Sequence, residues 1–162
     1  MLTIILVSCS GTKFINVESE NYDTRVKYLV LHFTSEGFDE SMRLLTTESS
    51  RPVSAHYLIS NGTYRGNNSK DGIYQLVEEK YRAWHAGISY WNGERGINDN
   101  SIGIEITNPG HQYGYRNFSS KQILSLKKLL YFLIKKYRIK KNCVLGHSDI
   151  SPSRKKDPGE KF

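Results

Sequence analysis

Cysteine is scarce in this sequence and long apolar runs are absent, and each absence excludes a class of protein. The 162 residues include only Cys9 and Cys143, too few for a framework of disulfide bonds. No stretch has the roughly 20 consecutive apolar residues that a helix needs to cross a bilayer. Internal repeats and low-complexity segments are also missing. With 38% hydrophobic and 24% charged residues, the sequence predicts one globular domain with a sizeable core.

The sequence also lacks the signatures of DNA- and RNA-binding modules, although it is strongly basic. Lysine and arginine number 23 against 16 aspartates and glutamates, a formal net charge of +7. Such a charge favours association with polyanions, and nucleic acid, an anionic cell wall and a membrane surface are the candidates. No helix-turn-helix, zinc-finger or aromatic RNA-binding motif accompanies the charge. We therefore expect no nucleic-acid partner, and a basic nucleic-acid-binding protein remains an alternative that rests on charge alone.

The first residues form a short apolar run without the basic residues that open a signal peptide. This run ends in Leu6-Val7-Ser8-Cys9, which resembles the end of a bacterial lipoprotein signal, where the cysteine is lipidated. Residues 10–24 are polar and lack periodicity, as in a tether. We therefore expect a signal-like segment and tether over residues 1–24, with Cys9 as a lipid anchor to the outer membrane and a monomeric protein in the periplasm. The alternatives are a true start further upstream, or an ordinary Cys9 thiol on a buried segment and a cytoplasmic protein.

Strand and helix patterns alternate from residue 25 to the end, which predicts an α/β domain over residues 25–162. The pattern of apolar residues predicts helices at 39–47 and 119–137 and strands at 26–33, 54–59, 73–77, 100–106 and 144–145. Asn61-Gly62 predicts a hairpin turn between the second and third strands. Ser119 and Gln122 form a capping box at the start of the last helix, whose other face is rich in lysine.

Two histidines stand where strands end, the usual place for chemistry in α/β proteins. His32 closes the first strand, and His147 follows the last. Asp157 comes ten residues later in the closing stretch 146–159, which its prolines and glycines should keep out of regular structure. Two imidazoles and a carboxylate, with a water, would complete a tetrahedral catalytic zinc site. The competing interpretations are histidines with purely structural roles and a solvated, basic C-terminal tail.

A hydrolytic zinc site also needs a base for the water proton and a cation for the developing oxyanion. The strand at 100–106 places three isoleucines on one face and Ser101, Gly103 and Glu105 on the other. Glu105 is our candidate base and Lys155 our candidate cation. A solvent-exposed face around Glu105 is the alternative. No His-Glu-x-x-His helix is present, so spacing alone indicates this site only weakly. His56, inside its predicted strand, is expected to be a structural histidine.

These residues resemble a known family, the zinc-dependent N-acetylmuramoyl-L-alanine amidases of the type 2 class. That class is related to phage T7 lysozyme and to the peptidoglycan recognition proteins, and the chain looks closest to its lipoprotein and cytosolic recycling members. Five segments in family order carry the resemblance: Val30–Thr34, Ser54–Leu58, Trp84–Gly87, Ser101–Glu105 and Gly146–Gly159.

The resemblance implies a central mixed β-sheet flanked by helices, with one zinc ion in an open groove. By the same resemblance, zinc is held by His32, His147 and Asp157, Glu105 is the catalytic acid/base and Lys155 stabilises the transition state. The implied reaction cleaves the amide between N-acetylmuramic acid, or its 1,6-anhydro form, and L-alanine in peptidoglycan or muropeptides. The segment with Trp84 and His85 would line the groove, and from its charge and position Arg154 would pair with a stem-peptide carboxylate.

Two features depart from the family pattern. Ala55 stands where phage-type members have a tyrosine, so any such role falls to Glu105. The chain also ends five residues after Asp157, which predicts a loosely held Asp157 loop and leaves open a truncated form of a longer protein. The alternative function is a peptidoglycan-binding module without catalysis. The sequence does not choose between anhydro and non-anhydro sugars or between stem-peptide lengths.

Overall fold

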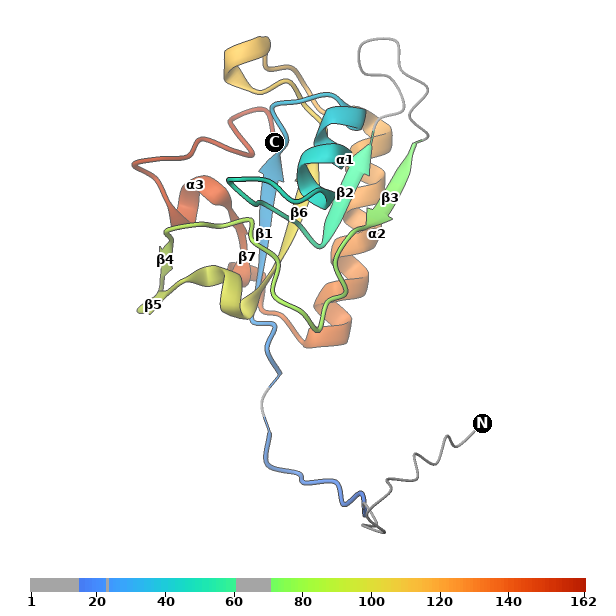
Figure 1. Ribbon diagram of the computed structural model, residues 1–162, viewed down its shortest axis with the longest axis vertical. Helices are drawn as coiled ribbons and strands as arrows, with labels where there is room; N and C mark the ends of the chain where they lie inside the picture. Colours follow the sequence, from blue (N-terminus) through green and yellow to red (C-terminus); the bar gives the residue numbers. More distant parts are fainter. Residues whose placement is uncertain (1–14, 23, 61–70) are drawn as a thin grey trace.

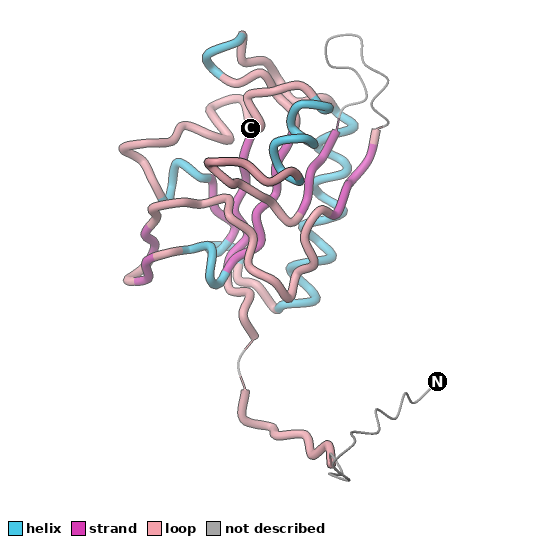
Figure 2. The backbone as a smooth tube through the Cα atoms, in the orientation of Figure 1, coloured by secondary structure: helices cyan, strands magenta, loops and turns pink. Residues whose placement is uncertain are grey.

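A five-stranded mixed sheet forms the centre of the computed structural model, which describes residues 15–22, 24–60 and 71–162. Its strands lie in the order β3-β2-β6-β1-β7 (Figures 1 and 2). Their bounds are β1 Tyr28–Phe33, β2 Tyr57–Ser60, β3 Gly72–Gln75, β6 Ser101–Ile106 and β7 Val144–Gly146. β1, β2, β6 and β7 run parallel, and β3 pairs with β2 in the antiparallel sense. The expected mixed sheet is confirmed.

The main core lies between one face of the sheet and the long helix α2, Ser120–Tyr137. Leu29 and Leu31 of β1 and the three isoleucines of β6 contribute buried side chains to this core. Leu126, Leu129 and Leu133 of α2 pack against them. The capping box at Ser119 and Gln122 is present, as predicted. Burial of these apolar side chains is the main stabilisation of the sheet–helix sandwich.

The opposite face of the sheet is covered by shorter elements. Helix α1, Phe38–Thr46, packs through Leu45 against Leu58 of β2. Helix α3, His147–Ile150, packs through Ile150 against Val30 of β1. The 3-10 helices lie in the connections: η1 Ile97–Asn100, η2 His111–Tyr113 and η3 Lys141–Cys143. Side chains of β1 and β6 alternate between the two faces. His32 and Glu105 therefore point away from α2.

Several local predictions need correction. The aromatic loop around Trp91 forms a small hairpin of β4 Tyr90–Trp91 and β5 Glu94–Arg95. The closing stretch begins with helix α3, because the Asp149 side chain accepts a hydrogen bond from the backbone of Gly146 and caps the turn (2.7 Å). His56 lies before β2 and not inside it, and its Nδ1 accepts a hydrogen bond from the backbone of Gly103 (3.0 Å). His56 is thus a buried structural histidine, as expected.

Other predictions fall on residues that the structure does not describe. Cys9 and its apolar run, and the Asn61-Gly62 turn, lie outside the described residues. In the part that is described, no helix combines the length and the apolar character that a membrane crossing requires.

Candidate metal centre and active site

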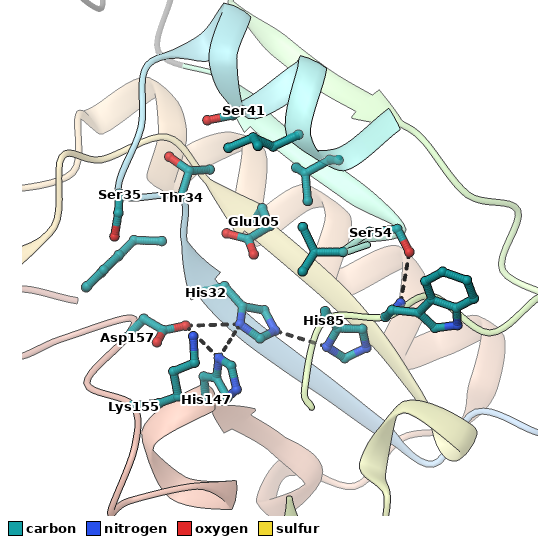
Figure 3. A pocket seen from close by; sticks show the side chains of 15 residues that line it. His32, Thr34, Ser35, Ser41, Ser54, His85, Glu105, His147, Lys155 and Asp157 are labelled. Carbon is teal, nitrogen blue, oxygen red and sulfur yellow. Dashed lines mark hydrogen bonds and ion pairs between the residues drawn. The ribbon is translucent and has the colours of Figure 1, made fainter. Parts of the chain in front are cut away.

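Three side chains from separate segments converge at the carboxyl ends of the parallel strands (Figure 3). His32 comes from the end of β1, His147 opens α3 directly after β7, and Asp157 lies in the closing loop. The Nδ1 atoms of His32 and His147 are 2.9 Å apart, and each is 3.0 Å from Oδ2 of Asp157. All three residues are buried. The structure therefore brings together the three ligands that the sequence predicted.

A chain of hydrogen bonds fixes which ring nitrogen of His32 carries the proton. The Ser101 hydroxyl donates to the backbone oxygen of Ile97, so its oxygen accepts from Nε2–H of His85 (3.2 Å). Nδ1 of His85 is then an acceptor, and it lies 3.0 Å from Nε2 of His32. His32 consequently donates from Nε2 and keeps a free lone pair on Nδ1. Metal-binding histidines are commonly held in this way by a hydrogen bond from the other ring nitrogen.

His147 is held in the same tautomer by a different partner. Its Nε2 lies 3.0 Å from the backbone oxygen of Ala86, which can only accept, and 3.4 Å from Nη2 of Arg154, which can only donate. The shorter contact, to Ala86, assigns the proton to Nε2. With the protons on Nε2, the Nδ1 atoms of both rings and a carboxylate oxygen direct lone pairs at one point and cannot satisfy one another by hydrogen bonds. A cation resolves this conflict, and two imidazoles with one carboxylate are a typical catalytic zinc donor set. The residues present fit Zn²⁺.

Burial and charge prepare these groups for a cation at neutral pH. Burial lowers the pKa of His32 to about 4, although contact with Asp157 acts in the opposite direction. Burial acts to raise the pKa of Asp157, but its contacts with His147 and His32 outweigh burial and lower that pKa below its usual value. Neutral His32 and ionised Asp157 are the forms that bind metal.

Glu105 faces the same pocket from the neighbouring strand. It is the register partner of His32 in the parallel β1–β6 pair. Burial, with some help from Asp157 and against Lys155, raises the pKa of Glu105 to about 8. Among the described residues, no group hydrogen-bonds to its buried Oε2 atom. Lys155 lines this pocket too, and Figure 3 shows it extending toward the cluster of ligands. The Glu105 carboxyl, the Lys155 ammonium group and the three candidate metal ligands therefore line one cavity.

Comparison with known proteins agrees with this geometry. The family model described as N-acetylmuramoyl-L-alanine amidase matches residues 22–160. The chain belongs to this family. It is 42% identical to N-acetylmuramoyl-L-alanine amidase AmiD of Escherichia coli over 98% of its own length and 62% of that relative's. It is also 42% identical to 1,6-anhydro-N-acetylmuramyl-L-alanine amidase AmpD of Haemophilus influenzae, over 68% of this chain and 54% of that one. The chain thus spans less than two thirds of the length of these two curated relatives.

Solved amidase structures share the fold. AmiD from E. coli, in complex with the substrate anhydro-N-acetylmuramic acid-L-Ala-D-gamma-Glu-L-Lys, superimposes with a TM-score of 0.76 at 40% identity, covering 90% of this chain and 57% of that one. AmpDH3 from Pseudomonas aeruginosa, in complex with anhydromuramic pentapeptide, gives a TM-score of 0.80 at 35% identity, covering 98% and 63%. The expected amidase fold is confirmed.

In this member of the family, His85 supports His32, one of the three candidate metal ligands. It is buried, and its backbone N–H donates to Oδ1 of Asn98 (3.1 Å). Its ring fills the space beside Gly103, where an added Cβ would lie 2.3 Å from the ring carbon Cγ. The absence of a side chain at Gly103 therefore leaves room for the ring of His85. The role of His85 as a groove residue stays a prediction.

Trp84 and Arg154, both predicted to bind substrate, have different surroundings in the structure. Trp84 lines the pocket and is 48% exposed, at its rim. The Nη2 atom of Arg154 donates to the backbone oxygens of Ala86 (2.8 Å) and Ile88 (3.1 Å). Arg154 thus braces the loop whose Ala86 oxygen orients His147. Its pairing with a stem-peptide carboxylate remains a prediction.

The Asp157 loop is anchored by contacts that the sequence did not indicate. The hydroxyl of Tyr115 donates to the backbone oxygen of Pro158 (2.7 Å) and accepts from the backbone of Lys161 (3.1 Å). Gly159 has φ +87°, and a Cβ there would lie 2.5 Å from the Tyr115 hydroxyl oxygen. The backbone oxygen of Asp157 also accepts from Ser148 (2.9 Å). The prediction of a loosely held Asp157 loop is therefore wrong.

Proposed function

We propose that this chain hydrolyses the amide bond between N-acetylmuramic acid, or its 1,6-anhydro form, and L-alanine in peptidoglycan or muropeptides, using one zinc ion. The observation that carries the proposal is the convergence of three lone-pair donors, from His32, His147 and Asp157, in the pocket that also holds Glu105. The names of the relatives and the muropeptides in their solved complexes support the substrate class.

The residues of the pocket can carry out this hydrolysis. When bound, Zn²⁺ supplies a Lewis acid for the scissile carbonyl and makes water more acidic. Glu105 takes a proton from the attacking water at a carboxylate oxygen. The water oxygen bonds to the lactyl carbonyl carbon, the C–N bond breaks, and the same carboxyl returns the proton to the amide nitrogen. The products are a lactyl carboxylic acid and the free amine of L-alanine.

Lys155 and Trp84 also contribute to the reaction, and the pKa of Glu105 suits its role. The ammonium group of Lys155 stabilises the negative charge that develops on the carbonyl oxygen. The raised pKa of Glu105, about 8, suits a group that must both accept and donate a proton near neutral pH. Trp84, at the rim of the pocket, provides an apolar wall for the sugar or the stem peptide.

A Glu105→Gln protein tests the assignment of the base. We expect it to bind zinc as wild type does, and to release stem peptide from a muramyl tripeptide at least about a hundredfold more slowly. Mass spectrometry of the released peptide measures the rate. Wild-type turnover by this variant would contradict the role of Glu105. A wild-type protein that binds zinc and muropeptide without turnover would instead establish the alternative, a non-catalytic peptidoglycan-binding module.

We also propose that the protein acts in the periplasm as a monomer, anchored to the outer membrane through a lipidated Cys9. The support is the Leu6-Val7-Ser8-Cys9 pattern. Mass spectrometry of the N-terminal peptide from cells tests the anchor, because lipidation would make Cys9 the first residue and add the mass of acyl chains. An unmodified Cys9 within a longer N-terminal peptide would favour the cytoplasmic alternative.

A further inference from the structure

The outward face of α2 carries both positive charge and exposed apolar side chains. No aspartate or glutamate occurs between Glu105 and Asp149, while nine lysines and arginines do. Five of these cations are lysines of α2, and all five are exposed. Leu124, Tyr131 and Phe132 stand among them, with exposed fractions of 54%, 63% and 52%. We call the surface made by Leu124, Lys127, Lys128, Tyr131, Phe132 and Lys135 the α2 face.

The positive charge at the centre of the α2 face is not neutralised by the carboxylates described near it. Lys121 pairs with Asp71 near the start of the helix, and Lys136 pairs with Glu79 near its end. Within the described part of the chain, no carboxylate lies within 4.0 Å of the ammonium groups of Lys127, Lys128 and Lys135. Lys135 instead lies over the ring of Tyr131, 4.5 Å from its centre. The positive charge of the α2 face is therefore complementary to an anionic partner.

The exposed apolar side chains decide which anionic partner fits. A soluble polyanion would engage the lysines and gain little from Leu124, Tyr131 or Phe132. At a bilayer surface, by contrast, aromatic and aliphatic side chains enter the boundary between head groups and acyl chains while lysines reach anionic head groups. We propose that the α2 face docks the protein on membranes that contain anionic phospholipid.

This docking leaves the pocket accessible. Leu126, Leu129 and Leu133 on the inner side of α2 pack on one face of the sheet, whereas His32 and Glu105 project from the other. Figure 1 shows α2 on one side of the sheet with α1 on the other. A membrane against the α2 face would thus lie behind the sheet, with the pocket turned away from it. The inference does not depend on the proposed reaction.

Binding to vesicles, measured by sedimentation of the full chain, tests the proposal. We expect wild type to bind phosphatidylcholine vesicles that contain phosphatidylglycerol and not vesicles of phosphatidylcholine alone. A triple variant should bind these vesicles about a hundredfold more weakly, because each lysine removed weakens binding about fivefold. It carries Lys127→Gln, Lys128→Gln and Lys135→Gln. The matched control, Arg51→Gln with Lys80→Gln and Arg95→Gln, removes the same charge elsewhere on the surface and should bind nearly as wild type does. All these proteins keep the same N-terminal residues, and circular dichroism confirms that each is folded.

A second variant separates a membrane from other polyanions. Tyr131→Ser with Phe132→Ser keeps every lysine, so it should lose vesicle binding by about tenfold or more and retain binding to soluble polyphosphate. Vesicle binding unchanged in this variant would overturn the proposal in favour of a charge-only polyanion surface. Wild-type vesicle binding by the triple lysine variant, or no binding by wild type, would also overturn it.

Discussion

The Nε2 atom of His32 lies 3.0 Å from the Nδ1 atom of His85, and this contact orients a ring of the candidate metal centre. Because His85 in turn donates to Ser101, the proton of His32 is held on Nε2 and its Nδ1 is left for a cation. The rings meet edge to face, with centroids 5.1 Å apart. A residue outside the ligand triad thus determines how one ligand presents its lone pair.

Replacing His85 should therefore weaken zinc binding without removing a ligand. For His85→Ala we expect a loss of about 10- to 100-fold in zinc affinity, the usual effect of removing an outer partner of a ligating histidine. Competition with a chromogenic chelator measures it. Ile88→Ala, at an exposed side chain of the same loop, is the matched control and should keep wild-type affinity. Unchanged zinc affinity in His85→Ala would show that the hydrogen bond does not position His32.

The positions of His32, His147 and Glu105 near strand ends could be predicted from local sequence patterns, and the family resemblance then indicated their roles. Alternation in Ser101–Ile106 placed Glu105 opposite the isoleucine face, and apolar runs ended at His32 and before His147. The role of His85 could not be found in this way. Its loop has no period, and its neighbours Gly103, Ser101 and Asn98 come together only in the fold.

Long-range contacts also explain what the sequence missed in the closing stretch. Tyr115 lies in an irregular connection, and nothing local marks it as the anchor of Pro158 and Lys161. The α3 turn depends on the Asp149 side chain, whereas the prolines and glycines of this stretch predicted irregular structure.

Removing the Tyr115 hydroxyl should loosen the Asp157 loop. For Tyr115→Phe we expect a loss of about 1 kcal/mol, equivalent to at most about fivefold in zinc affinity if the whole effect falls on this loop. Calorimetric titration of zinc into metal-free protein measures the change. Tyr113→Phe, at a 52% exposed side chain, serves as the control. Equal zinc affinity for the two variants would argue against Tyr115 as the anchor.

The buried carboxyl of Glu105 should make the metal-free protein less stable as pH rises. Its folded-state pKa is about 8, against an ordinary value of 4.5. Between these values the unfolded chain has released the proton while the folded protein retains it, so the free energy of unfolding falls with rising pH.

The Glu105→Gln substitution removes the loss of stability that ionisation of this carboxyl causes as pH rises. Relative to wild type, the metal-free variant should gain on the order of 3 kcal/mol in unfolding free energy between about pH 5 and about pH 8. Urea denaturation in the presence of a chelator at several pH values measures the difference. A difference that stays constant across this range would mean that Glu105 ionises normally in the folded protein.

The central claim is that metal held by His32, His147 and Asp157 acts with Glu105 to cleave a muramyl amide. Mass spectrometry of stem-peptide release from defined muropeptides, before and after chelation and after addition of Zn²⁺, tests it most directly. We predict release by the untreated protein, none after chelation, and recovery as Zn²⁺ reaches one ion per chain. Release that continues undiminished in fully metal-free protein would contradict the account.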